Sequence, residues 1–416
     1  MRQTSVALAA PLSAEDCAIQ SMADASPVKW HLAHTTWFFE TFVLVPHVPG
    51  YRLFDPAFGY LFNSYYNAIG ERHPRPERGM LSRPSLEEVR AYRQHVDDAM
   101  LAASNLSEAL VELGLHHEQQ HQELILTDVK HMLSRSPLKP AYQRQWPLTP
   151  IRARAPKWVG FAGGLHEIGH AGGGFAFDNE TPRHKVWLED YEIASHPVTH
   201  GDLLEFMADG GYRRPELWLS AGWDFVRARG WEAPEYWTRR DGQWHTFTLH
   251  GEVPVDPNTP ICHVSFFEAE AYARWAGKRL PNEAEWEVAA SWDESAGVSR
   301  KFPWGNELPT ERHANVDQLA FETAPVGAYP LNMSPLGCYG MIGDVWEWTS
   351  SDFVGYPGFR AFPYPEYSEV FFGSEYKVLR GGSWATRPRA VRNTFRNWDY
   401  PIRRQIFSGF RCASDD

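Results

Sequence analysis

The sequence predicts an α+β protein of two domains, an N-terminal four-helix bundle followed by a larger domain of short strands and helices. Residues 13–134 contain long helical segments separated by proline-rich turns, whereas residues 157–416 contain short apolar runs broken by Gly, Pro, Asn and Asp. The length of 416 residues also exceeds what one hydrophobic core usually organises. We therefore expect two separate cores.

The helices of the bundle are located from their start signals. Ser13 to Asp16 is typical of a helix start, Pro27 suits the first position of a second helix, and Ser85 with Glu88 forms a third cap. The expected helices are one that starts near Ser13, then 30–44, 85–104 and 106–133. Residues 46–84, rich in Gly, Pro and aromatics, should form one long crossover, and such bundles place metal sites between facing helices.

The boundary between the domains is expected at a proline-rich, basic stretch without periodicity, residues 137–156, which we interpret as a linker. The bundle then occupies residues 1–136 and the second domain residues 157–416. Within the second domain, two helical pieces are expected at 266–276 and 283–290.

Composition narrows the class of protein. The net charge of −12 argues against a nucleic-acid partner, because such binding draws on clustered Lys and Arg. No stretch approaches the ~18 apolar residues of a membrane span, so no membrane partner is expected. The N-terminus has no long apolar core, and the four cysteines form no C-x-x-C pair, which together predict a cytoplasmic protein. The 18 Trp residues favour a small-molecule pocket.

His117 and His121 are the most informative residues. On a helix, positions i and i+4 lie on the same face, so both imidazoles can bind one ion. The second helix offers His31 and His34 as a third ligand from across the bundle. A lone histidine is ordinarily a hydrogen-bonded core or surface residue, but this pair with a facing partner favours a metal site.

Two chemistries remain for such a site. His117-Glu118-x-x-His121 matches the zinc peptidases, in which the glutamate is the general base. That chemistry needs a third ligand on a later helix, and only His131 lies between His121 and the linker. Three neutral imidazoles with open positions instead suit iron(II).

The motifs add a resemblance that covers nearly the whole chain. Residues 26–40 and 117–123 resemble the DinB-like bundle of ergothioneine sulfoxide synthases. The C-terminal half resembles the formylglycine-generating-enzyme (sulfatase-modifying factor) fold, a C-type-lectin-like domain, in residues 275–287, 302–306, 343–348, 380–384 and 409–411. Formylglycine-generating enzymes carry two copper-binding cysteines at positions that match Thr386 and Val391 here, so the resemblance does not extend to that activity.

The resemblance implies an activity and its cofactor. Members of the family join the sulfur of a cysteine-containing thiol to the imidazole of hercynine (trimethylhistidine) and oxidise the sulfur with dioxygen, in ergothioneine biosynthesis. It implies non-haem iron(II) held by His34, His117 and His121, with His31 as a packing residue or a partner behind the ligands. In this fold calcium is often a second, structural ion, for which Asp344 and Glu347 offer oxygen ligands, although a solvated turn is the alternative.

The resemblance also assigns the residues that bind hercynine. Gln120 matches the glutamine that hydrogen-bonds the substrate imidazole. Asn397, Trp398 and Asp399 match the segment that holds the quaternary ammonium, for which an indole face supplies cation–π attraction. Arg403 matches the arginine that binds a substrate carboxylate.

The crossover contains candidate residues for the proton donor and for the binding of the second substrate. Tyr65 and Tyr66 resemble the adjacent tyrosines of the subgroup that uses free cysteine, and a tyrosine is protonated at neutral pH. Tyr356, Tyr364 and Tyr367 are rivals for the donor role. Arg72 and Arg75 suit the carboxylate of the thiol, and two arginines would also suit γ-glutamylcysteine. Cysteine is the favoured thiol.

Two alternatives share these motifs. One is selenoneine synthase, which joins selenium from a selenosugar to hercynine. The other is a non-catalytic, lectin-like binding protein whose bundle histidines hold a structural zinc with four closed ligands.

Overall fold

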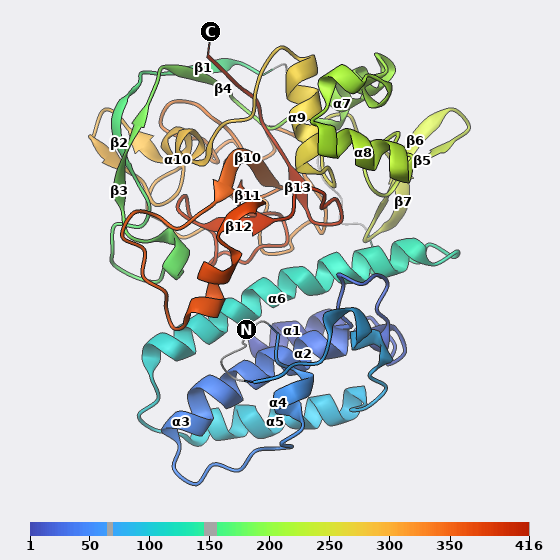
Figure 1. Ribbon diagram of the computed structural model, residues 1–416, viewed down its shortest axis with the longest axis vertical. Helices are drawn as coiled ribbons and strands as arrows, with labels where there is room; N and C mark the ends of the chain where they lie inside the picture. Colours follow the sequence, from blue (N-terminus) through green and yellow to red (C-terminus); the bar gives the residue numbers. More distant parts are fainter. Residues whose placement is uncertain (65–69, 145–155, 416) are drawn as a thin grey trace. The chain divides into compact units, whose positions relative to one another are not determined.

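The computed structural model describes residues 1–64, 70–144 and 156–415 (Figure 1). The chain forms two compact units, Met1–Gln143 with Ala361–Val370, and Arg144–Arg360 with Phe371–Asp416. The first unit is helical and the second combines helices with short antiparallel strands. The predicted α+β class is therefore confirmed.

The first unit is built on four helices joined by a long crossover. The helices are α1 (Arg2–Ala9), α2 (Val28–Phe38), α5 (Leu86–Ala102) and α6 (Glu108–Arg135), with the short α3 (Val45–His47) and α4 (Phe58–Leu61) in the crossover. α2 contacts both α5 and α6, and α1 lies against α2 and α6. Every residue of α2 is buried, so this helix is the centre of the unit.

Local signals placed three of these helices well. Ser85 and Glu88 form the expected capping box at the start of α5, and α2 begins directly after Pro27. α2 continues as a π-helical segment, Phe39–Leu44, which accounts for the predicted end at Leu44. In α6 the cap is Ser107, whose hydroxyl accepts a hydrogen bond from the Leu110 amide.

The predicted first helix is wrong in position. Ser13 and Asp16 do exchange the reciprocal side-chain bonds of a cap, but only a single 3-10 turn, Asp16–Ala18, follows before the chain becomes extended at Ile19. α1 lies earlier and has no side-chain cap. It is held by tertiary contacts of Arg2 with α5 and α6, which local signals do not reveal.

The second unit is built from short strands in several small sheets. Its strands are β1 Trp158–Phe161, β2 Gly164–Ile168, β3 His184–Leu188, β4 Tyr191–Ala194, β5 Trp237–Arg240, β6 Gln243–Thr248, β7 Gly251–Pro254, β8 Trp292–Asp293, β9 Val298–Ser299, β10 Trp346–Phe353, β11 Gly373–Arg380, β12 Arg396–Asp399, β13 Ser408–Gly409 and β14 Ala413–Ser414. The largest sheet has the order β12-β11-β10-β13, and a three-stranded sheet has the order β1-β4-β14. β14 pairs with β4, so the end of the chain closes a sheet that begins near residue 158.

Four helices pack around these sheets: α7 (His200–Ala208), α8 (Ser220–Arg229), α9 (Phe266–Trp275) and α10 (Glu283–Ser291). α9 and α10 match the expected pieces to within one residue, and both begin with a capping box. The Trp286 side chain of α10 is fully buried in a core that also contains Ile193 and Met341.

The segment Ala361–Val370 belongs to the first unit, although the predicted boundaries place it in the second domain. Within the first unit, the Tyr364 ring stacks on Phe42 at a centroid distance of 4.8 Å. Tyr367 reaches Gln120 of α6. A boundary placed at a linker assumes continuous domains, so it misses a short segment that returns from far along the chain.

Across the described ranges, no helix is both long enough and apolar enough to span a membrane.

Candidate metal centre

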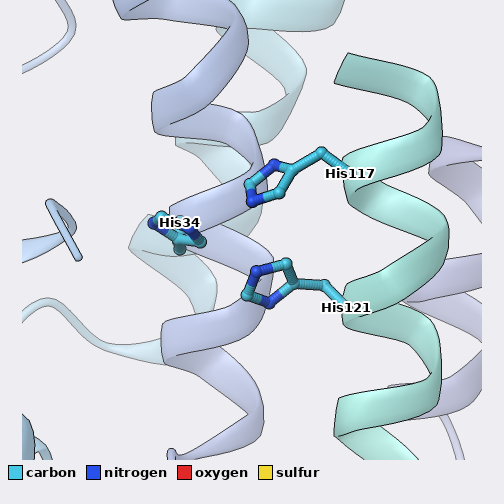
Figure 2. Close-up of side chains that lie close together, drawn as sticks. All are labelled: His34, His117 and His121. Atoms are coloured by element: carbon cyan, nitrogen blue, oxygen red, sulfur yellow. The ribbon is translucent and has the colours of Figure 1, made fainter. Parts of the chain in front are cut away.

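Three buried histidines converge between two helices of the first unit. His34 comes from α2, and His117 and His121 come from adjacent turns of α6 (Figure 2). Each residue offers one ring nitrogen, and these three nitrogens all lie within 4.8 Å of one another. This is the only such group of histidine, cysteine and carboxylate ligands among the residues that the structure describes. The geometry is that of a three-ligand metal site with no carboxylate in the set.

Aromatic packing fixes the orientation of the imidazoles. The Trp30 indole stacks on His34 with the ring centroids 4.6 Å apart and the planes 12° from parallel. The Phe38 ring packs against the α6 residue His117, with the ring centroids 4.8 Å apart. These rings leave the three side chains little rotational freedom and exclude water from their flanks.

Burial keeps the three imidazoles neutral. It is the largest cause that lowers the pKa of each, and the pKa of His117 falls to about 4. For His34 and His121, repulsion from neighbouring imidazoles lowers the pKa further. Neutral imidazole is the form that binds a metal, so near neutral pH no proton has to be displaced.

The nitrogen atoms also suit a metal ion. His34 Nδ1 donates to the Phe62 carbonyl at 2.6 Å, which leaves the lone pair of a neutral ring on Nε2. His117 Nδ1 is buried and has no hydrogen-bond partner among the described residues. His121 Nδ1 lies 2.8 Å from His31 Nδ1. The three residues therefore fit a metal ion, and imidazole ligands suit several first-row metals, iron among them.

Glu118 does not take part in this site. Its carboxylate accepts hydrogen bonds from Ser5 at 2.6 Å, Arg93 at 2.7 Å and Arg2 at 2.9 Å. Burial raises the pKa of Glu118, but the two guanidinium groups outweigh that effect and bring it to about 2. A carboxylate held by two arginines is a poor general base, which argues against the peptidase chemistry.

Gln120 is hydrogen-bonded to Tyr367, one of the three tyrosines that the sequence offered as rivals to Tyr65 and Tyr66. The Tyr367 hydroxyl donates to Gln120 Oε1 at 3.2 Å, next in sequence to the ligand His121. The two residues are 247 positions apart, so no local pattern links them. Tyr65 and Tyr66, the predicted proton donors, lie outside the described residues.

The arginines of the crossover have varied surroundings. Arg72 donates to the Ser64 carbonyl and Arg75 to the Asp24 carbonyl, so each holds the chain in place. Arg78, which sequence reasoning did not select, is buried and its guanidinium lies 3.4 Å from the centroid of the Trp30 ring. Arg78 therefore packs against the same indole that stacks on the candidate ligand His34.

The residues expected to bind hercynine's ammonium lie on β12 in the second unit. The Trp398 indole is covered on one face by Phe353, with the centroids 4.1 Å apart and the planes nearly parallel. Phe371 lies 5.5 Å away at a tilt, so Trp398 belongs to an aromatic cluster. Asn397 accepts a hydrogen bond from the Trp398 amide. Whether these residues serve the histidine site stays a prediction.

Arg403 and Asp399 contact each other directly. The Arg403 Nε donates to Asp399 Oδ1 at 3.1 Å, and the Tyr400 amide donates to the same oxygen. The two residues are four positions apart and form an ion pair. The ion pair restricts the side chains of Arg403 and Asp399. Their role in binding a substrate remains a proposal.

The calcium expectation is not supported by the donor atoms. Glu347 is buried and both of its oxygens accept from Arg411, at 2.6 and 2.7 Å. Asp344 Oδ1 accepts from the Asn315 side chain and the Ala324 amide, and burial raises the pKa of Asp344 to about 6. These carboxylate oxygens already accept hydrogen bonds from within the protein, so they do not form the free anionic oxygen set that calcium prefers.

Comparisons with known proteins match two families, one in each part of the chain. Residues 1–109 match the DinB superfamily, and residues 146–416 match the sulfatase-modifying factor enzyme 1-like domain. A protein of Mycobacterium tuberculosis named hercynine oxygenase is 40% identical over 397 residues, which cover 94% of this chain and 91% of the relative. A hercynine oxygenase of Mycolicibacterium thermoresistibile is 39% identical over 94% of this chain and 87% of its own length. One of Mycolicibacterium smegmatis is 49% identical over 58% of this chain and 56% of its own length.

Proposed function

Since the chain belongs to the hercynine oxygenase family, we propose that it is a non-haem iron(II) enzyme that uses dioxygen to join hercynine to a thiol and to oxidise the sulfur. The product is a sulfoxide on the way to ergothioneine. The observation that carries the proposal is the buried cluster of His34, His117 and His121, in a chain similar to these relatives over nearly its whole length. Cysteine is the favoured thiol, and γ-glutamylcysteine is the alternative.

The proposed reaction balances without a further reductant. The imidazole C–H bond and the thiol S–H bond break, and a C–S bond forms. One oxygen atom of dioxygen is added to the sulfur, and the other leaves as water with the two hydrogens. Dioxygen takes up four electrons, two from bond formation and two from oxidation of the sulfur.

The histidine cluster orients this chemistry. His34, His117 and His121 would hold iron(II), which would supply positions for a thiol, an imidazole and dioxygen and would favour loss of the thiol proton. The side chains of Trp30 and Phe38 exclude water from the rear of the ligands. Gln120 is proposed to donate from its amide nitrogen to the substrate imidazole, while Tyr367 holds its oxygen.

The remaining substrate contacts are proposals from the resemblance. Trp398 is proposed to offer its face that is not stacked on Phe353 to the quaternary ammonium of hercynine, with Asn397 and Asp399 beside it. Arg403 is proposed to bind the carboxylate of hercynine. Arg72 and Arg75 are proposed to bind the carboxylate of the thiol, for which the planar guanidinium is suited.

The proton donor has two groups of candidates. Tyr65 and Tyr66 remain the candidates from the crossover. Tyr367 is the candidate with a supporting contact, because its hydroxyl is bonded to Gln120, which precedes a ligand on the same helix. We infer that the Tyr367 hydroxyl group donates a proton at the site where dioxygen reacts.

Replacing Tyr367 with phenylalanine tests this inference. Loss of the hydroxyl should lower the sulfoxide yield, relative to simple oxidation of the thiol, by about 100-fold or more, a typical contribution of a positioned acid. Product analysis by mass spectrometry measures both outcomes. Tyr364→Phe is the matched control, since that ring lies in the same segment and stacks on Phe42. An unchanged product ratio in Tyr367→Phe, with a change in Tyr65→Phe or Tyr66→Phe, would return the role to the crossover.

The substrate proposal is tested by offering three partners separately. The iron-loaded protein is incubated aerobically with hercynine and cysteine, γ-glutamylcysteine or a selenosugar, and the products are compared. We expect the highest turnover with cysteine. Selenium-containing product alone would identify a selenoneine synthase instead. No product from any partner, together with no oxygen uptake, would favour the non-catalytic lectin-like alternative.

A further inference from the structure

Behind the ligand His121 lies a chain of buried hydrogen bonds that ends in a carboxylate. His31 Nδ1 lies 2.8 Å from His121 Nδ1, and His31 Nε2 lies 2.9 Å from Asp128 Oδ2. The same carboxylate oxygen accepts the Ser26 amide at 2.8 Å. Each of these residues is less than one-tenth exposed. This series of hydrogen bonds therefore runs from the Ser26 amide to the Asp128 carboxylate and on to the imidazoles of His31 and His121. None of these residues is exposed to solvent.

The helices place these groups by simple periodicity. On α6, His121 and Asp128 are two turns apart and share one face. On α2, His31 is one turn before His34 on the face toward α6. His31 on α2 thus bridges His121 and Asp128 of the facing helix.

The direction of the hydrogen bonds follows from what each atom can do. A carboxylate only accepts, so the proton of a neutral His31 ring lies on Nε2, and Nδ1 has a lone pair. That lone pair accepts the proton of His121 Nδ1. The lone pair of His121 then lies on Nε2. Reversing the tautomer of His121 would break its bond to His31 and put a proton on the nitrogen that must bind metal.

The hydrogen bonds described for the other two ligands are different. His34 donates to a backbone carbonyl, and His117 Nδ1 has no hydrogen-bond partner within the described residues. The described hydrogen bonds connect His121, through His31, to the Asp128 carboxylate. A carboxylate behind an imidazole raises the basicity of the ligand nitrogen and fixes the ring.

We propose that Asp128 and His31 form a relay that sets the tautomer and donor strength of His121, and so determines how tightly the site holds iron(II). Both are positioning residues, because neither side chain is expected to touch the metal. The proposal rests on the proposed function only in the identity of the metal.

The relay is tested by iron affinity, measured by anaerobic titration of the full-length protein with iron(II) in competition with a chelator. His31→Leu removes both hydrogen bonds and keeps an apolar side chain of similar size. We expect it to lower the affinity by about 10- to 100-fold. His31→Gln can accept from His121 through its carbonyl and donate to Asp128 through its amide, so we expect it to restore most of the affinity. Asp128→Asn keeps an acceptor but removes the charge, and we expect an intermediate loss.

A matched control separates the relay from general damage to the helix pair. His131 is also buried on α6 and bonds to Ser21, away from the ligands, so His131→Leu should leave the iron affinity unchanged. The melting temperature of each metal-free variant reports folding, and the spectrum of the nitric oxide adduct reports the ligand field of the iron.

Three outcomes would overturn the relay. They are native affinity in His31→Leu, equal losses in His31→Gln and His31→Leu, or an equal loss in His131→Leu. If His31→Leu does not fold, native affinity and an unchanged nitric oxide spectrum in Asp128→Asn would overturn it instead. Failure of the proposed function has a different signature, because a variant series that shifts iron affinity as expected supports the relay even where no sulfoxide forms.

Discussion

Replacing His117 with alanine should abolish iron binding and turnover while the second unit stays folded. His117 supplies one of three ligands, and the structure describes no carboxylate or cysteine in the cluster that can substitute for it. The loss in iron affinity should exceed the 10- to 100-fold typical of losing a partner behind a ligand. Anaerobic iron titration and oxygen uptake with both substrates measure the two effects.

His116→Ala provides the control for this variant. His116 is buried on the same helix, next to His117, but is not a member of the ligand cluster. It should keep iron binding and turnover. Retained turnover in His117→Ala would contradict the ligand assignment, whatever the control shows.

Replacing Glu118 with glutamine should destabilise the bundle by about 3–5 kcal/mol, because the change removes the buried carboxylate that pairs with the buried Arg93 and the part-buried Arg2. The network connects all four helices. Arg2 lies on α1, Arg93 on α5 and Glu118 on α6, and Arg93 also donates to the Leu32 carbonyl of α2. Denaturant unfolding followed through the helical signal measures the loss in free energy of unfolding.

The same variant separates two accounts of the histidine motif. A peptidase would lose its general base but keep its stability. In the account given above, the loss is in stability, and a Glu112→Gln control at an exposed position of α6 should change the free energy of unfolding by no more than about 0.5 kcal/mol. Native stability in Glu118→Gln would show that the ion pairs contribute little.

The stability that Glu118 contributes also depends on pH. Its folded pKa of about 2 lies below its usual value of 4.5. The contribution is therefore present above pH 4.5 and is lost as the pH falls toward 2, where the folded carboxylate takes up a proton.

Sequence patterns were sufficient to predict a helix or a site where the residues that determine it are close together in the sequence. The spacing of His117 and His121 predicts a shared helix face, the cap of α5 lies at Ser85 as expected, and α9 and α10 lie at the expected residues. They were insufficient where the determinant is a contact between distant segments. α1 is held by ion pairs of Arg2, and Tyr367 meets Gln120 across 247 positions.

Charge pairing is a second feature that motifs do not give. The motifs raised Glu118 as a possible base, a reading disfavoured by the missing third ligand, and Glu347 as a possible calcium ligand beside the alternative of a solvated turn. In the structure Glu118 is paired with Arg2 and Arg93, and Glu347 is paired with Arg411. Motifs specify residue types along the chain, whereas the partner of a buried charge is set by the fold.

The most direct test of the proposed activity follows the oxygen atoms. The iron-loaded protein is incubated with hercynine and cysteine under isotopically labelled dioxygen, and the products are analysed by mass spectrometry. The account predicts a hercynyl-cysteine sulfoxide that contains one labelled oxygen atom, formed in a one-to-one ratio with the dioxygen consumed. Dioxygen uptake that is independent of hercynine, or a sulfoxide without the label, would contradict it.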